Sequence, residues 1–145
     1  MAIVLIASVL YLFSTVLLAR RLARSGPGAP LALWISPSIA ALLHGAAHVL
    51  AWREAGGANL HFFSALSLVG LGMAALTLLM GIRGRMAALG VIVFPIAAVT
   101  LTLYAWVGRL DPQLLDWRLQ LHAWCALLAY ATLAIAAVLA LLLWL

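Results

Sequence analysis

Five long apolar runs, separated by short polar segments, make up almost the whole chain. They cover residues 2–18, 31–52, 60–81, 86–107 and 119–145. Each run is close to the roughly 20 residues that an α-helix needs to cross a bilayer, and none alternates as a barrel strand does. The pattern predicts an all-α, polytopic membrane protein that forms a single bundle of about five transmembrane helices. Pro37 falls early in the second run, where we expect it to kink the helix.

The composition indicates that lipid is the main solvent of this chain. Hydrophobic residues make up 68% and charged residues 8%, and the mean hydropathy is +1.24. The net charge of +5 comes from arginines alone, and in a soluble protein it would suggest nucleic acid. Because the arginines are scattered in short loops, we interpret them as determinants of topology and expect no nucleic-acid partner. The single cysteine, Cys125, cannot form an internal disulfide and is expected to pack as a small apolar residue.

The distribution of charge predicts the orientation of the helices. The loops after the first and third runs contain basic residues and no acid: Arg20, Arg21, Arg24, Arg83 and Arg85. The loops after the second and fourth runs contain all three acidic residues, Glu54, Asp111 and Asp116. Basic residues resist translocation, so we predict that the amino terminus lies outside and the carboxyl terminus is cytoplasmic. Trp34 and Trp144 then mark the inner membrane boundary.

Four histidines are concentrated toward the outer surface of this predicted bundle. His44 and His48 lie in the outer half of the second run, while His61 and His122 open the third and fifth runs. Ionisable residues within a membrane are costly and usually functional. His44 and His48 are four residues apart, so they share a helical face about 6 Å apart along the axis. They cannot approach one porphyrin from opposite sides, and a bis-histidine haem needs a partner from another helix.

His44 and His122 are the leading candidates for ligands of a haem iron, with His48 second, because imidazole is an ordinary axial ligand and the surroundings are apolar. A mononuclear zinc or copper site is less favoured, since no Asp or Glu lies inside the runs to complete it. His61 lies beside a loop, where a histidine at headgroup level is inexpensive. The alternative for each histidine is a hydrogen bond that only supports helix packing.

The remaining small and polar residues of the runs are expected to be structural. We expect the glycines to be close-packing positions, in particular Gly70, Gly72, Gly81 and Gly84. We expect the hydroxyl side chains to bond to their own helices, in particular Ser64, Ser67, Thr77, Thr100 and Thr102. The sequence contains no Ser/His/Asp arrangement, no phosphate-binding glycine loop and no pair of carboxylates within the membrane. We therefore predict that the protein is not an enzyme.

Three motifs together resemble a known family. The segment LLHGAAHVLAW, the following GGANLHFFSALSLVGLG, and LHAWCALLAYATLAIAAVLALLLW at 121–144 are similar in order and spacing to the CcsA/HemX/YpjD family of cytochrome c assembly membrane proteins. The similarity is greatest to the YpjD branch and covers about residues 38–144. Members of that family are nearly twice as long, so the chain corresponds to their amino-terminal half.

The resemblance implies a multi-pass protein of the bacterial inner membrane that binds or positions b-type haem near the periplasmic face. It also implies other cytochrome c assembly proteins as partners beside the lipid bilayer. By position, His44 or its neighbour His48 resembles the family's histidine within a membrane helix, and His122 resembles its outward-facing histidine. The competing hypothesis is a membrane scaffold or regulatory subunit without a cofactor. A transporter core is weaker, because Pro37 and Pro95 do not form a pair of matching broken helices.

Overall fold

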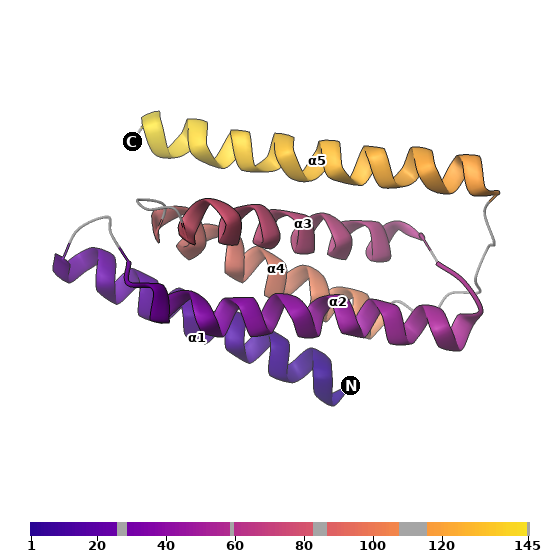
Figure 1. Cartoon of the computed structure of the whole chain (residues 1–145), viewed down its shortest axis with the longest axis horizontal. Helices are drawn as coiled ribbons and strands as arrows, with labels where there is room; N and C mark the ends of the chain where they lie inside the picture. The colour runs from indigo at the N-terminus through magenta and orange to yellow at the C-terminus, as the bar shows by residue number, and fades with distance from the viewer. Residues whose placement is uncertain (26–28, 59, 83–86, 108–115, 145) are drawn as a thin grey trace.

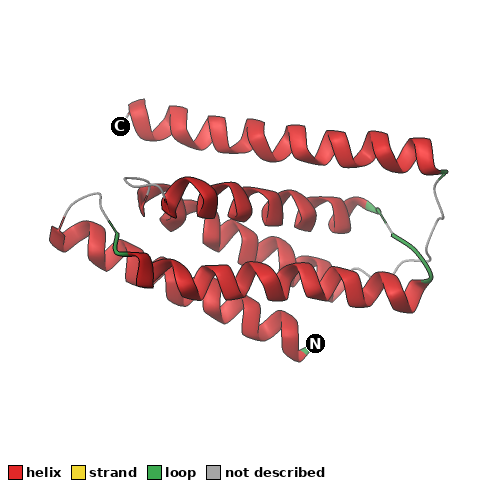
Figure 2. Cartoon of the chain, viewed as in Figure 1, coloured by secondary structure: helices red, strands yellow, loops and turns green. Residues whose placement is uncertain are grey.

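The computed structural model describes residues 1–25, 29–58, 60–82, 87–107 and 116–144. Its elements, in chain order, are α1 (Ala2–Ser25), the short 3-10 helix η1 (Leu31–Trp34), α2 (Ile35–Ala55), α3 (Phe62–Ile82), α4 (Ala87–Val107) and α5 (Trp117–Trp144) (Figure 1). The five α-helices are long and apolar enough to cross a membrane, and the described residues contain no strand (Figure 2). The predicted all-α, five-span architecture of a multi-pass membrane protein is therefore confirmed.

The helices form a core of four with a fifth at one side. Helix α4 packs against both α1 and α3, and α1 also packs against α2. Helix α5 packs mainly along α3 (Figure 1). The amino terminus, the carboxyl end of α2 and the start of α5 lie at the same end of the molecule, opposite the carboxyl terminus (Figure 1). Following the predicted topology, we call the end that carries the amino terminus the outer end.

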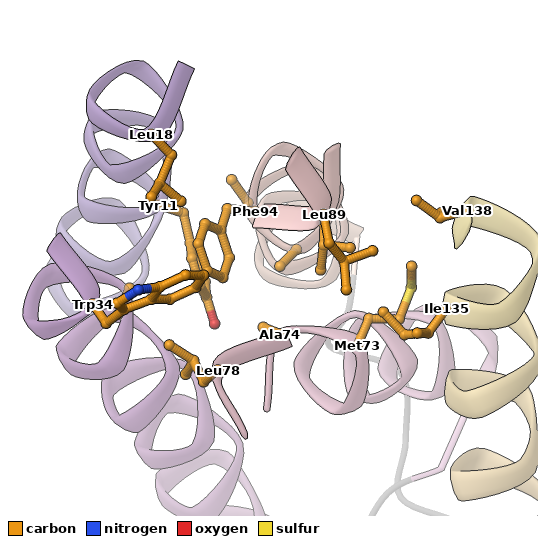
Figure 3. Packing of buried hydrophobic residues seen from close by; sticks show 14 of the residues in the cluster. Tyr11, Leu18, Trp34, Met73, Ala74, Leu78, Leu89, Phe94, Ile135 and Val138 are labelled. Carbon is orange, nitrogen blue, oxygen red and sulfur yellow. The ribbon is translucent and has the colours of Figure 1, made fainter. Parts of the chain in front are cut away.

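The aromatic centre of the core comes from three elements. Tyr11 of α1 stacks on Phe94 of α4 with ring centroids 5.7 Å apart, and Trp34 meets the same ring edge-on at 6.3 Å (Figure 3). The exposed fraction of Trp34 is only 2%, so its ring faces the interior of the bundle and not the surrounding lipid. Its ring lies where a Cβ of Gly81 would be, and this missing side chain lets the indole enter the bundle.

One predicted helix end differs from the structure, and the position of one predicted proline is now defined. Helix α1 continues to Ser25, beyond the end of its apolar run, because arginine is a good helix former and can extend a helix into the polar zone. Pro37 is the third residue of α2, where the backbone N–H has no partner within the helix. It therefore removes no hydrogen bond from the helix ladder. Pro95 does lie in the interior of α4.

Small residues allow close helix contacts, as predicted. A Cβ at Gly70 would collide with the Thr100 side chain of α4. At Gly72 it would come within 2.8 Å of the Ala131 Cβ of α5. These glycines set the spacing of α3 from its neighbours on both sides. Gly84 lies outside the described residues.

Candidate functional site

Helix α2 places two histidines inside the bundle. His44 and His48 are one turn apart, and their exposed fractions are 0% and 1%. Their rings stack, with centroids 5.6 Å apart and planes 20° from parallel. His44 lies 11 residues before the end of α2, about 16 Å from that end along the axis. The pair therefore extends from near the middle of the helix toward the outer end.

One serine of α3 connects the two rings. The Ser67 Oγ lies 2.9 Å from the His44 Nε2 and 3.0 Å from the His48 Nε2. Ser67 is fully buried. Its expected bond to its own helix is wrong, because the two imidazoles take the hydroxyl. The same expectation is also wrong for Ser64, whose Oγ has no hydrogen-bond partner among the described residues. It is confirmed for three threonines, whose hydroxyls donate to carbonyls of their own helices: Thr77 to Met73, Thr100 to Ala97 and Thr102 to Ala98.

Tyr11 of α1 completes the inner side of the site. Its hydroxyl lies 3.5 Å from the His44 Nδ1, and the two rings meet edge-on with centroids 6.0 Å apart. Tyr11 is fully buried and also stacks on Phe94. Both nitrogens of His44 therefore have partners within the protein.

Aromatic rings extend the site toward the outer end. Tyr104 of α4 stacks on His48 with centroids 4.3 Å apart, and His61 stacks on Tyr104 with centroids 5.9 Å apart. Trp52 follows His48 one turn later on α2, with centroids 5.6 Å apart, and meets Trp124 of α5 edge-on at 5.5 Å. An unbroken series of ring contacts thus joins the buried histidines to the outer end of α5.

The structure brings three of the four histidines together and leaves the fourth outside. His44, His48 and His61 belong to the connected ring system just described. His122 is exposed on α5, as is Cys125, so the predicted packing role of the cysteine is wrong. No contact joins His44 to His122 in the described part of the chain. The described residues also contain no group of three His, Cys, Asp or Glu side chains arranged to hold a metal ion.

Sequence reasoning missed Tyr11, Ser67 and Tyr104 as members of the site. Tyr11 and Tyr104 each carry a polar group within an apolar run, and this signal could have marked them. Ser67 had no distinguishing signal, because it looked equivalent to the other serine and threonine side chains in the runs. Comparisons with protein-family models, with curated proteins and with solved structures find no match for this chain.

Proposed function

We propose that this protein handles b-type haem at the outer end of its bundle, as an inner-membrane participant in cytochrome c assembly. The family resemblance motivates the proposal. The observation that carries it is the exposed histidine of α5, His122, beside an aromatic patch at the outer end. Haem supplies an iron centre that accepts axial imidazole ligands and changes its oxidation state.

The buried histidine pair does not fit a porphyrin. Both nitrogens of His44 are engaged, one by Tyr11 and one by Ser67. His48 is 1% exposed, bonds through its Nε2 to Ser67, and stacks with both His44 and Tyr104. A macrocycle could reach either imidazole only by separating α2 from α3. We assign the pair to the support of the outer end and not to iron ligation.

The start of α5 fits haem better. His122 is exposed, so its ring is open to a ligand. Arg118 lies four residues earlier on the same helical face, and its guanidinium lies over the exposed ring of Trp117. Arginine recognises carboxylates such as the propionates of haem. In this proposal His122 binds the iron, Arg118 holds a propionate, and the neighbouring tryptophans contact the macrocycle.

An absorption spectrum of the protein, purified gently after haem-replete expression, tests the proposal. We expect a Soret band that is lost in His122→Ala and weakened in Arg118→Gln. The ratio of haem to folded protein is expected to be unchanged in His61→Gln. A colourless protein, or a band that survives His122→Ala, would contradict this assignment.

A scaffold role is the second candidate, and the weak burial of α5 favours it. Only 11% of the most apolar part of α5 is buried in the bundle, and its exposed face carries large side chains, among them Leu121, Leu128, Leu133 and Leu141. Without a hydrophobic driving force in lipid, such a face binds a partner helix through shape and packing. This candidate predicts that no chromophore copurifies and that His122→Ala leaves partner association intact. Crosslinking from Cys125 in native membranes would measure that association.

A further inference from the structure

Three buried polar atoms near the outer side of the histidine pair have no hydrogen-bond partner among the described residues. They are the Nδ1 of His48, the Oγ of Ser64 and the Nε1 of Trp52. His48 is 1% exposed and Ser64 is fully buried. Buried polar atoms in native proteins are nearly always paired, so each unpaired one requires an explanation.

Helix register places the three residues within about one turn of each other along the bundle. Ser67 contacts His48, and Ser64 lies one turn closer to the outer end on the same side of α3. Because α2 runs in the opposite direction, the next turn outward from His48 carries Trp52, whose ring is 5.6 Å from that of His48. The unpaired atoms therefore flank the layer just outside the Ser67 bridge.

We propose that this layer is a binding site for a water molecule, and that Ser67 couples the site to Tyr11 by holding His44 and His48 in opposite tautomers. The indole N–H of Trp52 can only donate, whereas the Ser64 hydroxyl and the His48 Nδ1 can donate or accept. A ligand for this set needs a lone pair for the indole N–H, and it must be able to donate as well as accept if it is to match either tautomer of His48. Water meets this requirement, and a buried water typically has two to four such partners. The site is independent of haem.

The coupling follows from counting protons at Ser67. A serine hydroxyl has one hydrogen, and its only recorded partners in the described residues are the two imidazole nitrogens. If Ser67 donates to the His48 Nε2, it must accept from an Nε2–H of His44, and the reverse arrangement exchanges these roles. If both imidazoles donated to Ser67, its own hydrogen would have no recorded acceptor. The arrangement that satisfies all three atoms has Ser67 donate to one ring and accept from the other, so the two neutral rings have opposite tautomers.

The occupant of the outer site then sets the direction of the whole chain of hydrogen bonds. When water donates to the His48 Nδ1, His48 donates through Nε2 to Ser67, Ser67 donates to the His44 Nε2, and the His44 Nδ1–H donates to the Tyr11 hydroxyl oxygen. When water accepts from the His48 Nδ1–H, every bond reverses and the Tyr11 hydroxyl donates to His44. A change at the outer site is thus transmitted to the centre of the core without movement of a helix.

The tautomers are measured by ¹⁵N NMR of histidine-labelled protein in detergent, prepared without haem. His44→Gln and His48→Gln assign the two rings. We expect one ring to carry its hydrogen on Nδ1 and the other on Nε2. Ser67→Thr keeps a hydroxyl and should preserve this relation, as should the control Ser38→Ala, whose hydroxyl donates to the Trp34 carbonyl one turn earlier in the chain. Ser67→Ala should abolish it. The same tautomer, or a charged imidazolium, on both rings of the unaltered protein would overturn the coupling.

The water site is measured in the same samples by magnetisation transfer from water to the Trp52 indole N–H. We expect transfer in the unaltered protein and its loss or strong reduction in Ser64→Ala. Transfer that is absent from the unaltered protein, or unchanged in Ser64→Ala, would overturn the site. Neither measurement depends on haem. The absence of a Soret band would therefore not contradict the water site, and failure of the NMR experiments would not contradict haem binding at His122.

Discussion

Helices α4 and α5 are both apolar and long enough to cross a bilayer, yet they are used differently. More than half of the most apolar part of α4 is buried, 56%, compared with 11% of α5. Helix α4 buries nine residues along its length, whereas α5 buries only Ala131, Ile135 and Val138 among its described residues. Hydropathy alone does not distinguish a central helix from a peripheral one, because lipid and protein are both apolar surroundings.

The histidines follow the same division. His44 and His48 are buried in the four-helix core and both contact Ser67, while His122 lies exposed on the peripheral helix. Substitutions in the core should therefore lower the free energy of unfolding. Substitutions on the exposed face of α5 should instead affect the proposed binding of haem or of a partner helix.

The largest effect is expected for Phe94→Ala. Phe94 is fully buried and contacts both Tyr11 and Trp34, so its truncation leaves a cavity at the centre of the core. We expect a loss of about 3–5 kcal/mol in the free energy of unfolding. Unfolding by titration with a denaturing detergent, followed by circular dichroism, measures it. The matched control is Leu133→Ala on α5, where the side chain is 64% exposed. A similar loss of unfolding free energy in both variants would contradict the difference between the central helix α4 and the peripheral helix α5.

Ser67→Ala should have the next largest effect. It leaves the Nε2 atoms of two buried imidazoles without their partner, and each unsatisfied buried group costs about 1–3 kcal/mol. Ser38→Ala removes only a bond to the Trp34 carbonyl one turn earlier in the chain and should change stability by less than about 0.5 kcal/mol. The same unfolding titration compares the two serines, and equal losses would show that the imidazoles do not depend on Ser67.

Gly72→Leu is expected to displace α5 and to leave the other four helices folded. A Cβ at this position already comes within 2.8 Å of Ala131, and a larger side chain adds to the clash. Overpacking of this kind typically costs about 1–3 kcal/mol. A nitroxide attached to Cys125 should broaden the resonances of the outer half of α3 in the unaltered protein and not in the variant. Broadening that persists in Gly72→Leu would show that the contact is not essential for docking.

The smallest effect on stability is expected for His122→Ala. The side chain is exposed, and surface substitutions usually remain within about 0.5 kcal/mol. His48→Ala, by contrast, removes a buried ring with contacts to Ser67 and Tyr104 and should be clearly destabilising. Detergent unfolding of both variants tests this order. A larger loss in His122→Ala than in His48→Ala would place His122 in the packed part of the bundle.

The sequence predicted the number of helices and most of their boundaries well, because each span must bury about 20 apolar residues in lipid regardless of its neighbours. The i, i+4 spacing also predicted that His44 and His48 share a face, and the stacked rings confirm it. The role of Trp34 could not be predicted in this way. An interfacial tryptophan and a buried one look alike in sequence, and only the space left by Gly81 decides between them.

By itself, the sequence determined an all-helical, membrane-embedded chain with its histidines toward one end, because hydropathy and helical periodicity are local properties. Tertiary structure alone decided which hydroxyl serves the histidines, which nitrogens stay open and which histidine is exposed. Those outcomes depend on how α1, α3 and α4 approach α2, and on the weak docking of α5. Such approaches are set by side-chain shape across helices far apart in the chain, about which the pattern along one helix says nothing.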